Sequence, residues 1–311
     1  MKIKVGTDCS GIDAPIQALL NIGVNFSHIF SSDIDNYCIK SIKANYKPKI
    51  IFGDKEGQFP NGDITKRNLK NVPDIDLYIC GFPCQPFSLT GKQKGFRDKR
   101  SNVFFECIHL IVSKKPKIFI LENVKGLVSN NKGKTWEIIL QELESIEKYY
   151  NIYYDILNTR SYGIPQNRER LFIVGIKKNI QTQEFTFPEH VKMKDIKHFI
   201  DNTDNSKDNI TPTVKNTLDK SPKNAIFVDT CQPKNRYPNS HLWSPTLTTG
   251  NGLWCVPKKR HASLKEKIKL QGFPVNFKQV VSNTQFNKQL GNTISVNVLE
   301  YLIKECLDCI F

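Results

Sequence analysis

One cysteine of this chain has an unusual local setting. Cys84 stands between two prolines in the stretch GFPCQPFS, residues 81–88, directly after the apolar run DLYIC. Each proline fixes its own backbone φ and restricts the residue before it, so the thiol is expected on a stiff, extended turn at a strand end. A cysteine that only packs in a core does not need this geometry, whereas a nucleophile does. We therefore predict that Cys84 is a catalytic nucleophile, activated by neighbouring groups.

Polar residues that could assist a nucleophile follow two further apolar runs. The strand-like run KIFIL leads into Glu122 and Asn123, at a strand end expected beside the one that presents the cysteine. A carboxyl group there could protonate or hydrogen-bond a bound heterocycle, although a cap or a solvent-facing acid is the usual role of an isolated glutamate. Arg168 and Arg170 begin another strand, and their spacing places both on one face. Two such arginines suit an anionic or carbonyl-bearing substrate.

The segment after the cysteine is basic. SLTGKQKGFRDKR, residues 88–100, holds two glycines and five basic residues, and it is typical of a loop that closes over a phosphodiester backbone. Ser88, Lys92 and Arg97 are its candidate DNA contacts; an ordinary solvated loop is the alternative. The formal net charge of +15 also favours a polyanionic partner, nucleic acid first, with a lysine-rich composition as the alternative explanation.

A nucleotide-type site is expected at the first strand end. The stretch DCSGIDAP, residues 8–15, follows a strand and opens a helix, although Gly11 is its one match to the dinucleotide fingerprint. Asp33 ends the next strand, where an acid commonly bonds ribose hydroxyls. Asp63 in NGDIT is a third polar point, and capping or turn formation is the alternative role of both acids. Together these residues predict an adenosine-containing cofactor.

Strands and helices alternate along the first part of the chain, which predicts a doubly wound α/β sheet with its ligands at the carboxyl ends of the strands. The expected strands are 2–9, 27–33, 75–81, 117–124 and 168–176. The expected helices are 13–23, 36–46, 102–114, 135–150 and, at the end of the chain, 293–307.

The composition changes after about residue 180. Polar and turn-forming residues with interspersed aromatics replace the periodic apolar pattern, as is typical of a loop-rich domain of short strands. We assign residues 1–186 and 283–311 to a catalytic domain and residues 187–282 to a smaller inserted domain. The stretch 260–274 is expected to be a hinge helix between the two.

Composition also excludes several classes. The nine cysteines are scattered without the paired spacing of a zinc site, so we expect no metal and mostly buried, reduced thiols. No pattern resembles a signal peptide, and no apolar run approaches the roughly 18 residues that cross a bilayer. We therefore expect a cytoplasmic protein that binds no membrane.

Taken in order, the motifs resemble those of the cytosine-C5 DNA methyltransferases over nearly the whole chain. The matching stretches are DCSGIDAP, GDIT, GFPCQPFS, GKQKGFRDKR, LENVKGL, QNRERLFIVGI, LQGFP and KQLGNTISVNVL. The first turn departs from the family, because Cys9 and Asp13 stand where Phe-x-Gly-x-Gly has its phenylalanine and its second glycine. This departure bears on the affinity for the cofactor.

The resemblance implies a Rossmann-like S-adenosyl-L-methionine-dependent sheet and a mainly β target-recognition domain. Cys84 would be the nucleophile, Glu122 would contact N3 and the exocyclic amine of cytosine, and Arg170 would hold its O2 side, with Arg168 and Asn123 in support. The residues implied to line S-adenosylmethionine are Cys9, Ser10, Gly11, Ile12, Asp13, Asp33, Ile34, Asp63, Phe82, Asn292, Thr293 and Ile294.

The smaller domain would select the DNA sequence. Thr246 and Leu247 in SPTLTTG resemble a family marker for target recognition, and further candidate contacts to the groove or backbone are Arg236, Tyr237, His241 and Trp243. Ordinary loop packing is the alternative for these four. The implied partner is double-stranded DNA bound by a monomer, and the enzyme would serve either a cognate restriction endonuclease or a solitary role.

Two other functions compete with this interpretation. An RNA cytosine-C5 methyltransferase would share the catalytic domain, but the Cys-Phe-Thr element of the tRNA-modifying branch is absent. A non-enzymatic DNA-binding relative is favoured by the altered first turn and disfavoured by Cys84, Glu122 and Arg170.

Overall fold

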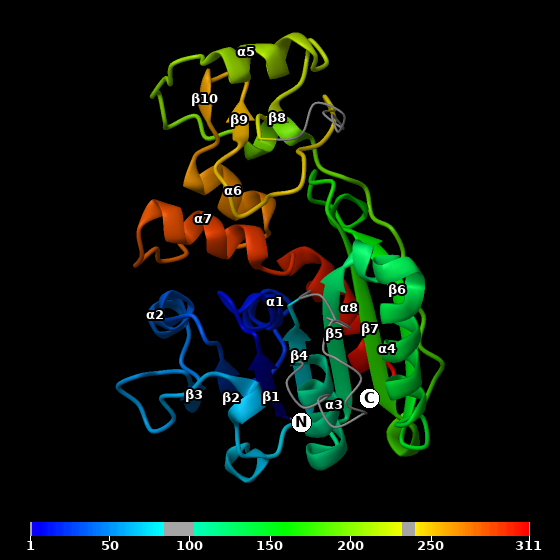
Figure 1. Ribbon diagram of the computed structural model, residues 1–311. Coiled ribbons are helices and arrows are strands. Elements are labelled where there is room, and N and C mark those ends of the chain that lie inside the picture. Colours follow the sequence, from blue (N-terminus) through cyan, green and yellow to red (C-terminus); the bar gives the residue numbers. More distant parts are fainter. Residues whose placement is uncertain (1, 84–102, 232–239, 311) are drawn as a thin grey trace.

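The larger part of the molecule is built on one seven-stranded sheet, covered on both faces by helices (Figure 1). The computed structural model describes residues 2–83, 103–231 and 240–310. In spatial order the strands are β3 (Ile50–Phe52), β2 (Phe26–Ser32), β1 (Ile3–Asp8), β4 (Leu77–Gly81), β5 (Ile118–Val124), β7 (Glu169–Lys177) and β6 (Tyr150–Asn158). The predicted doubly wound α/β sheet is confirmed.

Strand β7 runs antiparallel to both of its neighbours, β5 and β6, whereas the β1, β2, β3, β4 and β5 pairings are parallel. The carboxyl ends of β1, β2, β4 and β5 therefore meet at one edge of the sheet, and β7 begins at that same edge. Residues before β7 can thus join the residues that follow the parallel strands.

Successive residues of the central strands lie in two separate hydrophobic cores, because neighbouring side chains along a strand point to opposite faces of the sheet. Ile79 and Ile120 lie in the core with α1 (Ala14–Asn21), α7 (Asn283–Asn292) and α8 (Val296–Asp308). Tyr78 and Phe119 lie in the core with α3 (Val103–Lys114) and α4 (Lys134–Glu144). A further helix, α2 (Asn36–Asn45), follows β2. Burial on both faces explains why the central strands are apolar almost throughout.

The predicted helix over 135–150 is wrong at its end. Helix α4 stops at Glu144, and turns over residues 145–149 lead directly into β6. Strand β6 is rich in tyrosine and isoleucine, residues that favour strands, and it pairs with β7 along its length. Both β3 and α7 were also missing from the expected elements.

The smaller domain holds a three-stranded antiparallel sheet, in the order β10 (Arg260–His261), β9 (Leu253–Cys255) and β8 (Phe227–Asp229). Two helices accompany it, α5 (Pro212–Asp219), which the sequence did not predict, and α6 (Leu264–Leu270). The described residues also form short 3-10 helices, which are η1 (Ile64–Lys66), η2 (Leu69–Asn71), η4 (Lys125–Leu127), η5 (Asn130–Gly133), η6 (Thr159–Ser161), η7 (Lys178–Ile180) and η8 (Ile196–Phe199).

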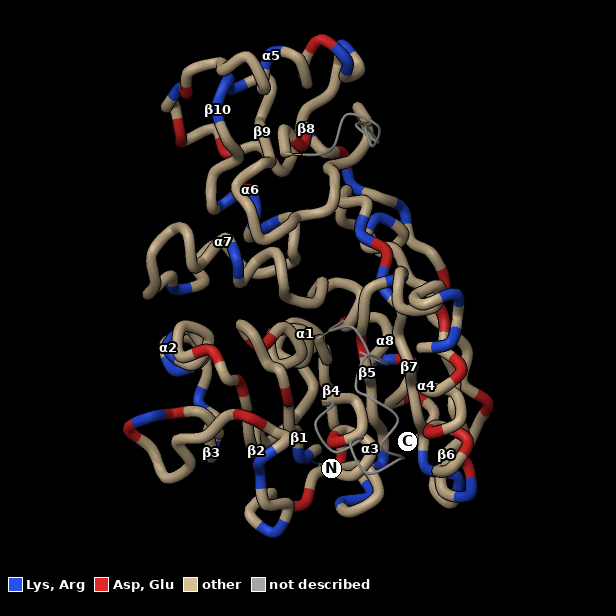
Figure 2. Tube along the Cα trace, in the orientation of Figure 1, with Lys and Arg blue, Asp and Glu red and all other residues tan. Residues whose placement is uncertain are grey.

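The two domains meet at the stretch expected to be a hinge. Leu270 packs in the core of the smaller domain, while Ile268 and Phe273 pack in the core beneath α8. Figure 1 shows α6 and α7 one above the other at this junction, and Figure 2 shows basic residues on both helices. The proposed domain limits remain a prediction, but this stretch contributes to both cores.

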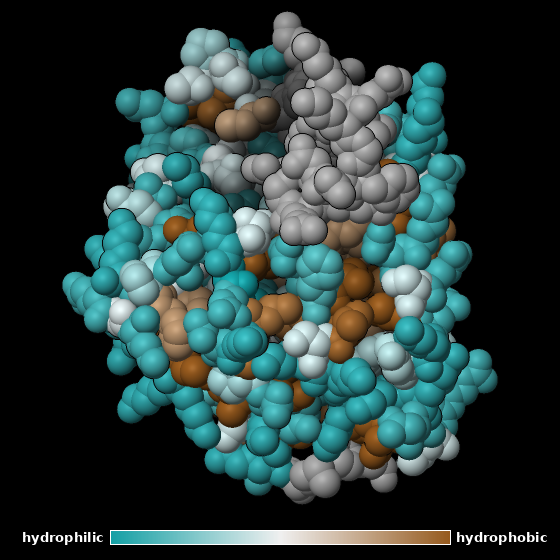
Figure 3. Space-filling view, turned by 60° about the horizontal axis from the view of Figure 1, so that its bottom comes forward, coloured by the Kyte–Doolittle hydropathy of each residue, from teal (hydrophilic) through white to brown (hydrophobic). Residues whose placement is uncertain are grey.

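One face of the molecule is mostly hydrophilic where its residues are described (Figure 3). The face in Figure 3 shows charged and polar residues over most of its described area, with apolar residues in patches between them. Over the ranges given above, no helix combines the length and the apolar character needed to span a membrane.

Candidate active site

A cavity of about 530 Å³ opens at the carboxyl ends of β1, β2, β4 and β5. This is the edge at which an open α/β sheet binds its ligands. The wall includes acidic groups toward β2 and the pair of Glu122 and Arg170 toward β5 and β7. Asn292, at the end of α7, and Thr293 and Ile294, between α7 and α8, also line it. Most of the predicted site residues within the described chain therefore share one cavity.

Glu122 and Arg170 form an ion pair in this cavity. The Arg170 Nε lies 3.2 Å from Glu122 Oε1, and Arg170 Nη1 donates to the carbonyl of Glu169 at 2.8 Å. The Glu122 side chain is buried, and burial raises its pKa above the usual range although the charges of Arg170 and Arg168 lower it. A carboxyl group of this kind can hold a proton and donate it to a ring nitrogen.

Strand register places Glu122 beside the segment that carries the predicted nucleophile. Gly81, the last residue of β4, pairs with Glu122 on β5. The Asn123 side chain donates from Nδ2 to the carbonyl of Phe82 at 2.8 Å, and its Oδ1 accepts the backbone N–H of Val124 at 2.8 Å. Asn123 therefore fixes the backbone one residue after β4.

Several predicted residues lie outside the described residues. They are Cys84, Ser88, Lys92 and Arg97 after β4, and Arg236 and Tyr237 in the smaller domain. Their proposed roles remain predictions.

Arg168 enters the cavity wall but is held by backbone groups. Its side chain is 1% exposed, and the guanidinium donates to the carbonyls of Leu247, Gly291 and Thr293 at 2.9, 3.0 and 2.7 Å. Burial first, and then the charge of Arg170, lower its pKa to about 9, so it stays a cation at neutral pH. Arg168 thus supports the site through the chain rather than by presenting a free charge.

Asp33 anchors the acidic end of the cavity. Its Oδ2 accepts the backbone N–H of Gly11 and its Oδ1 that of Asp35, both at 2.8 Å. Burial is the largest influence and raises the pKa of Asp33 to about 6. A Cβ on Gly62 would stand 1.9 Å from the Asp33 carbonyl oxygen, and one on Gly53 2.1 Å, so glycine is required at both positions.

The next side chain, Ile34, is 79% exposed although it is apolar, and it lines the same cavity. Asp63 also lines it, but its carboxylate caps η1 by accepting the backbone N–H of Thr65 at 3.0 Å. Asp63 therefore does both things considered for it: it caps a helix and it lines the cavity. The remaining predicted lining residues that border the cavity are Cys9, Ser10, Gly11, Phe82, Asn292, Thr293 and Ile294.

Ile12 and Asp13 are not among the residues that line the cavity. Ile12 is fully buried in the core beneath α1. The Asp13 carboxylate is also fully buried, and it accepts hydrogen bonds from Thr7 Oγ1 at 2.9 Å and Ser31 Oγ at 2.5 Å, with His28 Nε2 3.4 Å away. The expectation of a new carboxylate beside the cofactor is therefore corrected, because this carboxylate points into the protein.

Thr246 and Leu247 both make hydrogen bonds to residues just before β7. Thr246 Oγ1 donates to the carbonyl of Asn167 at 2.5 Å, and the Leu247 side chain is buried in the core of the smaller domain. Trp243 stacks with Arg160, whose guanidinium carbon lies 4.3 Å from the ring centroid, and His241 is exposed. A direct DNA contact by the Leu247 side chain does not fit this burial.

Sequence reasoning missed a charged group beneath the cavity. Asp8, which lines it, receives two hydrogen bonds from Arg67 at 2.7 and 2.6 Å and one from Tyr78 at 2.8 Å. The Arg67 guanidinium also lies over the rings of Phe30 and Phe52. The position of Asp8 at a strand end was the available signal, but its partner lies 59 residues away.

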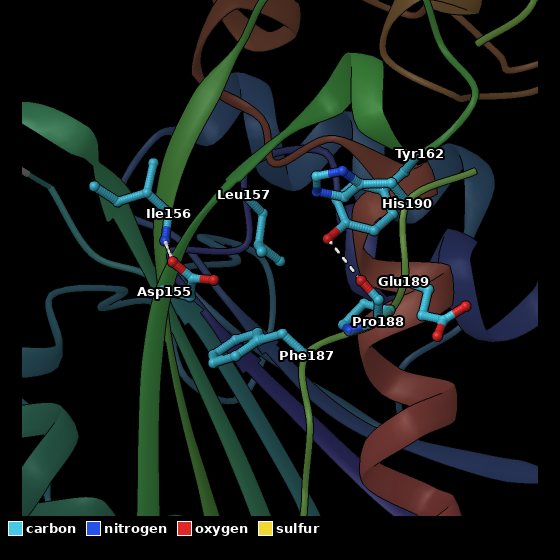
Figure 4. Close-up of a pocket in the computed structure, with 8 residues that line it drawn as sticks. All are labelled: Asp155, Ile156, Leu157, Tyr162, Phe187, Pro188, Glu189 and His190. Carbon is cyan, nitrogen blue, oxygen red and sulfur yellow. Dashed lines mark hydrogen bonds between the residues drawn. The ribbon is translucent and has the colours of Figure 1, made fainter. Parts of the chain in front are cut away.

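A second hollow of about 510 Å³ lies along the edge strand β6 and contains none of the predicted residues (Figure 4). Asp155, Glu189 and His190 line it, and the Tyr162 hydroxyl donates to the carbonyl of Pro188 at 3.1 Å. Its exposed acidic groups do not suit a polyanion. Among the described residues, no group of three or more His, Cys, Asp and Glu side chains is arranged to hold a metal ion.

Comparison with known proteins gives consistent results. A family model described as C-5 cytosine-specific DNA methylase matches residues 8–308. The type II methyltransferase M.HhaI of Haemophilus parahaemolyticus is 30% identical over 293 residues, which cover 88% of this chain and 85% of that protein. The type II methyltransferase M.BsuFI of Bacillus subtilis is 35% identical over 283 residues, covering 88% of this chain and 65% of that protein, so the chain spans about two thirds of its length.

Solved structures show the same fold. The crystal structure of S. pombe Dnmt2 methyltransferase superposes on this chain with a TM-score of 0.70 at 20% sequence identity, and the match covers 99% of each chain. A putative DNA modification methyltransferase encoded within a prophage of E. coli gives the same score, identity and coverage.

Proposed function

The chain belongs to the C-5 cytosine-specific DNA methylase family, and from that premise we propose how its residues methylate C5 of a cytosine in duplex DNA. The reaction is that of a DNA (cytosine-5-)-methyltransferase. We propose that Cys84 is the nucleophile and that Glu122 and Arg170 hold the base. The observation that carries this assignment is the buried Glu122–Arg170 pair, which lies beside the end of the strand leading to Cys84.

The residues of this chain can activate a base that is otherwise a poor nucleophile. The Cys84 thiolate adds to C6 of cytosine and makes the ring an enamine with electron density at C5. The Glu122 carboxyl group, whose pKa is raised by burial, donates its proton to N3 and absorbs the charge that develops there. Arg170 supports the O2 side. Once C5 carries the methyl group, loss of the C5 proton to water allows the thiolate to leave C6. N3 returns its proton to Glu122, and the aromatic ring is restored.

S-adenosylmethionine would supply an electrophilic methyl group for C5. The cavity offers groups that fit it: the Asp33 carboxylate for ribose hydroxyls, the exposed Ile34 for an apolar ring, and Asp63 and Phe82 beside them. Asn292 to Ile294 close the opposite wall. These contacts are proposals, and Ile12 and Asp13 are left out of the set because they point into the core.

The target base is hidden inside a DNA duplex, so it must rotate out of the stack to reach this cavity. We propose that the basic segment 88–100 and the smaller domain hold the DNA from two sides, in the cytoplasm, as a monomer. By analogy with the type II relatives, we propose that the enzyme modifies one short DNA sequence, either beside a cognate restriction endonuclease or as a solitary enzyme.

The proposal is tested by methylation of mixed-sequence duplex DNA with labelled S-adenosylmethionine, followed by bisulfite sequencing. The wild type should place methyl groups at C5 of cytosine within one short motif. Cys84→Ala should place none, while keeping its affinity for the cofactor. Methylation by Cys84→Ala, or a wild type that methylates tRNA and not DNA, would contradict the proposal.

A further inference from the structure

The segment before β7 is joined to the smaller domain over four consecutive residues. The backbone N–H of Ser244 donates to the carbonyl of Pro165 at 2.7 Å, and that of Asn167 donates to the carbonyl of Ser244 at 2.9 Å. The Gln166 side chain, fully buried, accepts the backbone N–H of Leu247 at 2.9 Å. Residues 165–168 are therefore tied by hydrogen bonds to residues 244–247, here called the recognition segment.

Arg168 extends this connection to the cofactor side of the cavity. One end of its guanidinium binds the carbonyl of Leu247, and the other end binds those of Gly291 and Thr293. A planar guanidinium with fixed donor directions sets the relative position of the groups that it bridges. Asn292 and Thr293 line the cavity, so one buried cation connects the recognition segment to the wall of the proposed cofactor site.

Gly291 lies directly against Thr248 and Thr249, the two residues that follow the recognition segment. A Cβ at this position would stand 2.4 Å from both the carbonyl carbon and the carbonyl oxygen of Thr248, and 2.5 Å from the backbone nitrogen of Thr249. No side chain fits between the two backbones at this distance. The two backbones therefore pack directly against each other at the junction that Arg168 bridges.

We propose that Arg168 is a positioning residue that couples DNA recognition to methyl-donor binding in this enzyme. The inference rests on the proposed function and deepens it, because it assigns to one side chain the linkage between its two substrates. When DNA fixes the position of the recognition segment, it also fixes the position of the cavity wall at Asn292 and Thr293. The donor, bound against that wall, in turn holds the recognition segment in its DNA-binding position.

Such coupling is reciprocal. The factor by which DNA tightens donor binding must equal the factor by which the donor tightens DNA binding, and values of about 5- to 150-fold are typical. We expect a factor in this range for the wild type. We expect it to fall close to one when the bridge is removed, because each ligand then orders only its own segment.

The experiment measures the dissociation constant of S-adenosylhomocysteine, a donor analogue without the transferable methyl group, with and without a saturating duplex that carries the mapped target sequence. Arg168→Lys keeps the charge but replaces the two donor nitrogens Nη1 and Nη2 by a single ammonium nitrogen, which cannot reach both sides of the bridge, and it should abolish the coupling. Gly291→Ala leaves Arg168 intact but forces the two backbones apart, and it should reduce the coupling as well. Arg160→Lys is the matched control, since Arg160 lies over the ring of Trp243 in the smaller domain and is not among the described residues that line the cavity.

The outcomes separate this inference from the proposed function. A wild type that methylates DNA but shows a coupling factor near one overturns the inference and leaves the function standing. Full coupling in folded Arg168→Lys, checked by thermal unfolding, also overturns it, and if that variant does not fold the result for Gly291→Ala decides. A wild type that binds both ligands but transfers no methyl group would instead contradict the proposed function.

Discussion

Acidification should weaken cofactor binding through Asp33. This carboxylate is half-buried, it accepts two backbone N–H groups, and it is the proposed acceptor for ribose hydroxyls. Burial raises its pKa from the ordinary 3.8 to about 6. The group therefore takes up a proton in a pH range where most carboxylates of the protein remain ionised.

The size of the effect follows from this pKa. At pH 5, about one unit below it, roughly ten molecules carry a protonated Asp33 for each that carries the carboxylate. If the cofactor binds the carboxylate form, its affinity falls about tenfold for each pH unit below 6, or about 1.4 kcal/mol per unit, and levels off above pH 6. The sign for folding is opposite: a raised carboxyl pKa adds stability that is present below pH 4 and is lost as the pH rises through about 6.

Isothermal titration calorimetry with S-adenosylhomocysteine between pH 5 and pH 7 measures the affinity directly. Asp33→Asn should bind more weakly at pH 7 and show little pH dependence. Asp35→Asn is the matched control on the same turn, because Asp35 caps α2 and does not accept the Gly11 N–H. Its charge contributes to the raised pKa of Asp33, so this variant should keep a clear pH dependence with its midpoint at a slightly lower pH. A wild-type affinity that is flat over this range, or a pH dependence that persists in Asp33→Asn, would refute the reasoning.

Three further substitutions test other parts of the site. Glu122→Gln removes the proposed proton donor and should lower the single-turnover methylation rate about 10²- to 10⁴-fold while S-adenosylhomocysteine affinity stays within a few-fold; an unchanged rate would exclude the role. Arg67→Met leaves the buried Asp8 carboxylate without its cation and should lower the free energy of unfolding, measured by urea titration, by about 3–5 kcal/mol. A loss below about 1 kcal/mol would contradict this expectation. Gly62→Ala presses a methyl group on the Asp33 carbonyl and should weaken S-adenosylhomocysteine binding at least about tenfold, whereas Gly126→Ala, which meets nothing within 4 Å, should bind normally.

The sequence predicted the sheet well because its central strands are short apolar runs that end in polar residues. Asp33 and Glu122 each follow or end such a run, and the parallel order of the strands brings them to one edge. The same local logic failed at β6, where a helical pattern ran into a strand without a glycine or proline between them. The tyrosines and isoleucines of this segment favour a strand, and its pairing with β7 along the whole length, which is not visible in the local pattern, decides its structure.

The connections within the site were less accessible to sequence reasoning. Arg168 was expected to face a substrate, but its partners are backbone carbonyls 79 to 125 residues further along the chain. Any residue type supplies such a carbonyl, so no pattern of side chains can reveal it. Asp13 was misjudged in the other direction. Its place in the first-turn motif suggested a carboxylate in the pocket. The residue instead has a left-handed backbone, with φ of 61°, and its carboxylate faces Thr7 and Ser31.

The direction of β7 also determines where another protein module can be attached. Strand β1 begins at Ile3, at the edge of the sheet opposite the cavity, and β7 ends at that same edge. A few residues after β7, the backbone N–H of Thr182 donates to the carbonyl of Cys309 at 2.8 Å. Both ends of the described chain thus lie away from the smaller domain (Figure 1). A module joined near Ile3 or Cys309 would lie away from the smaller domain (Figure 1), which we propose to select the DNA sequence, so such a fusion should leave sequence selection unchanged.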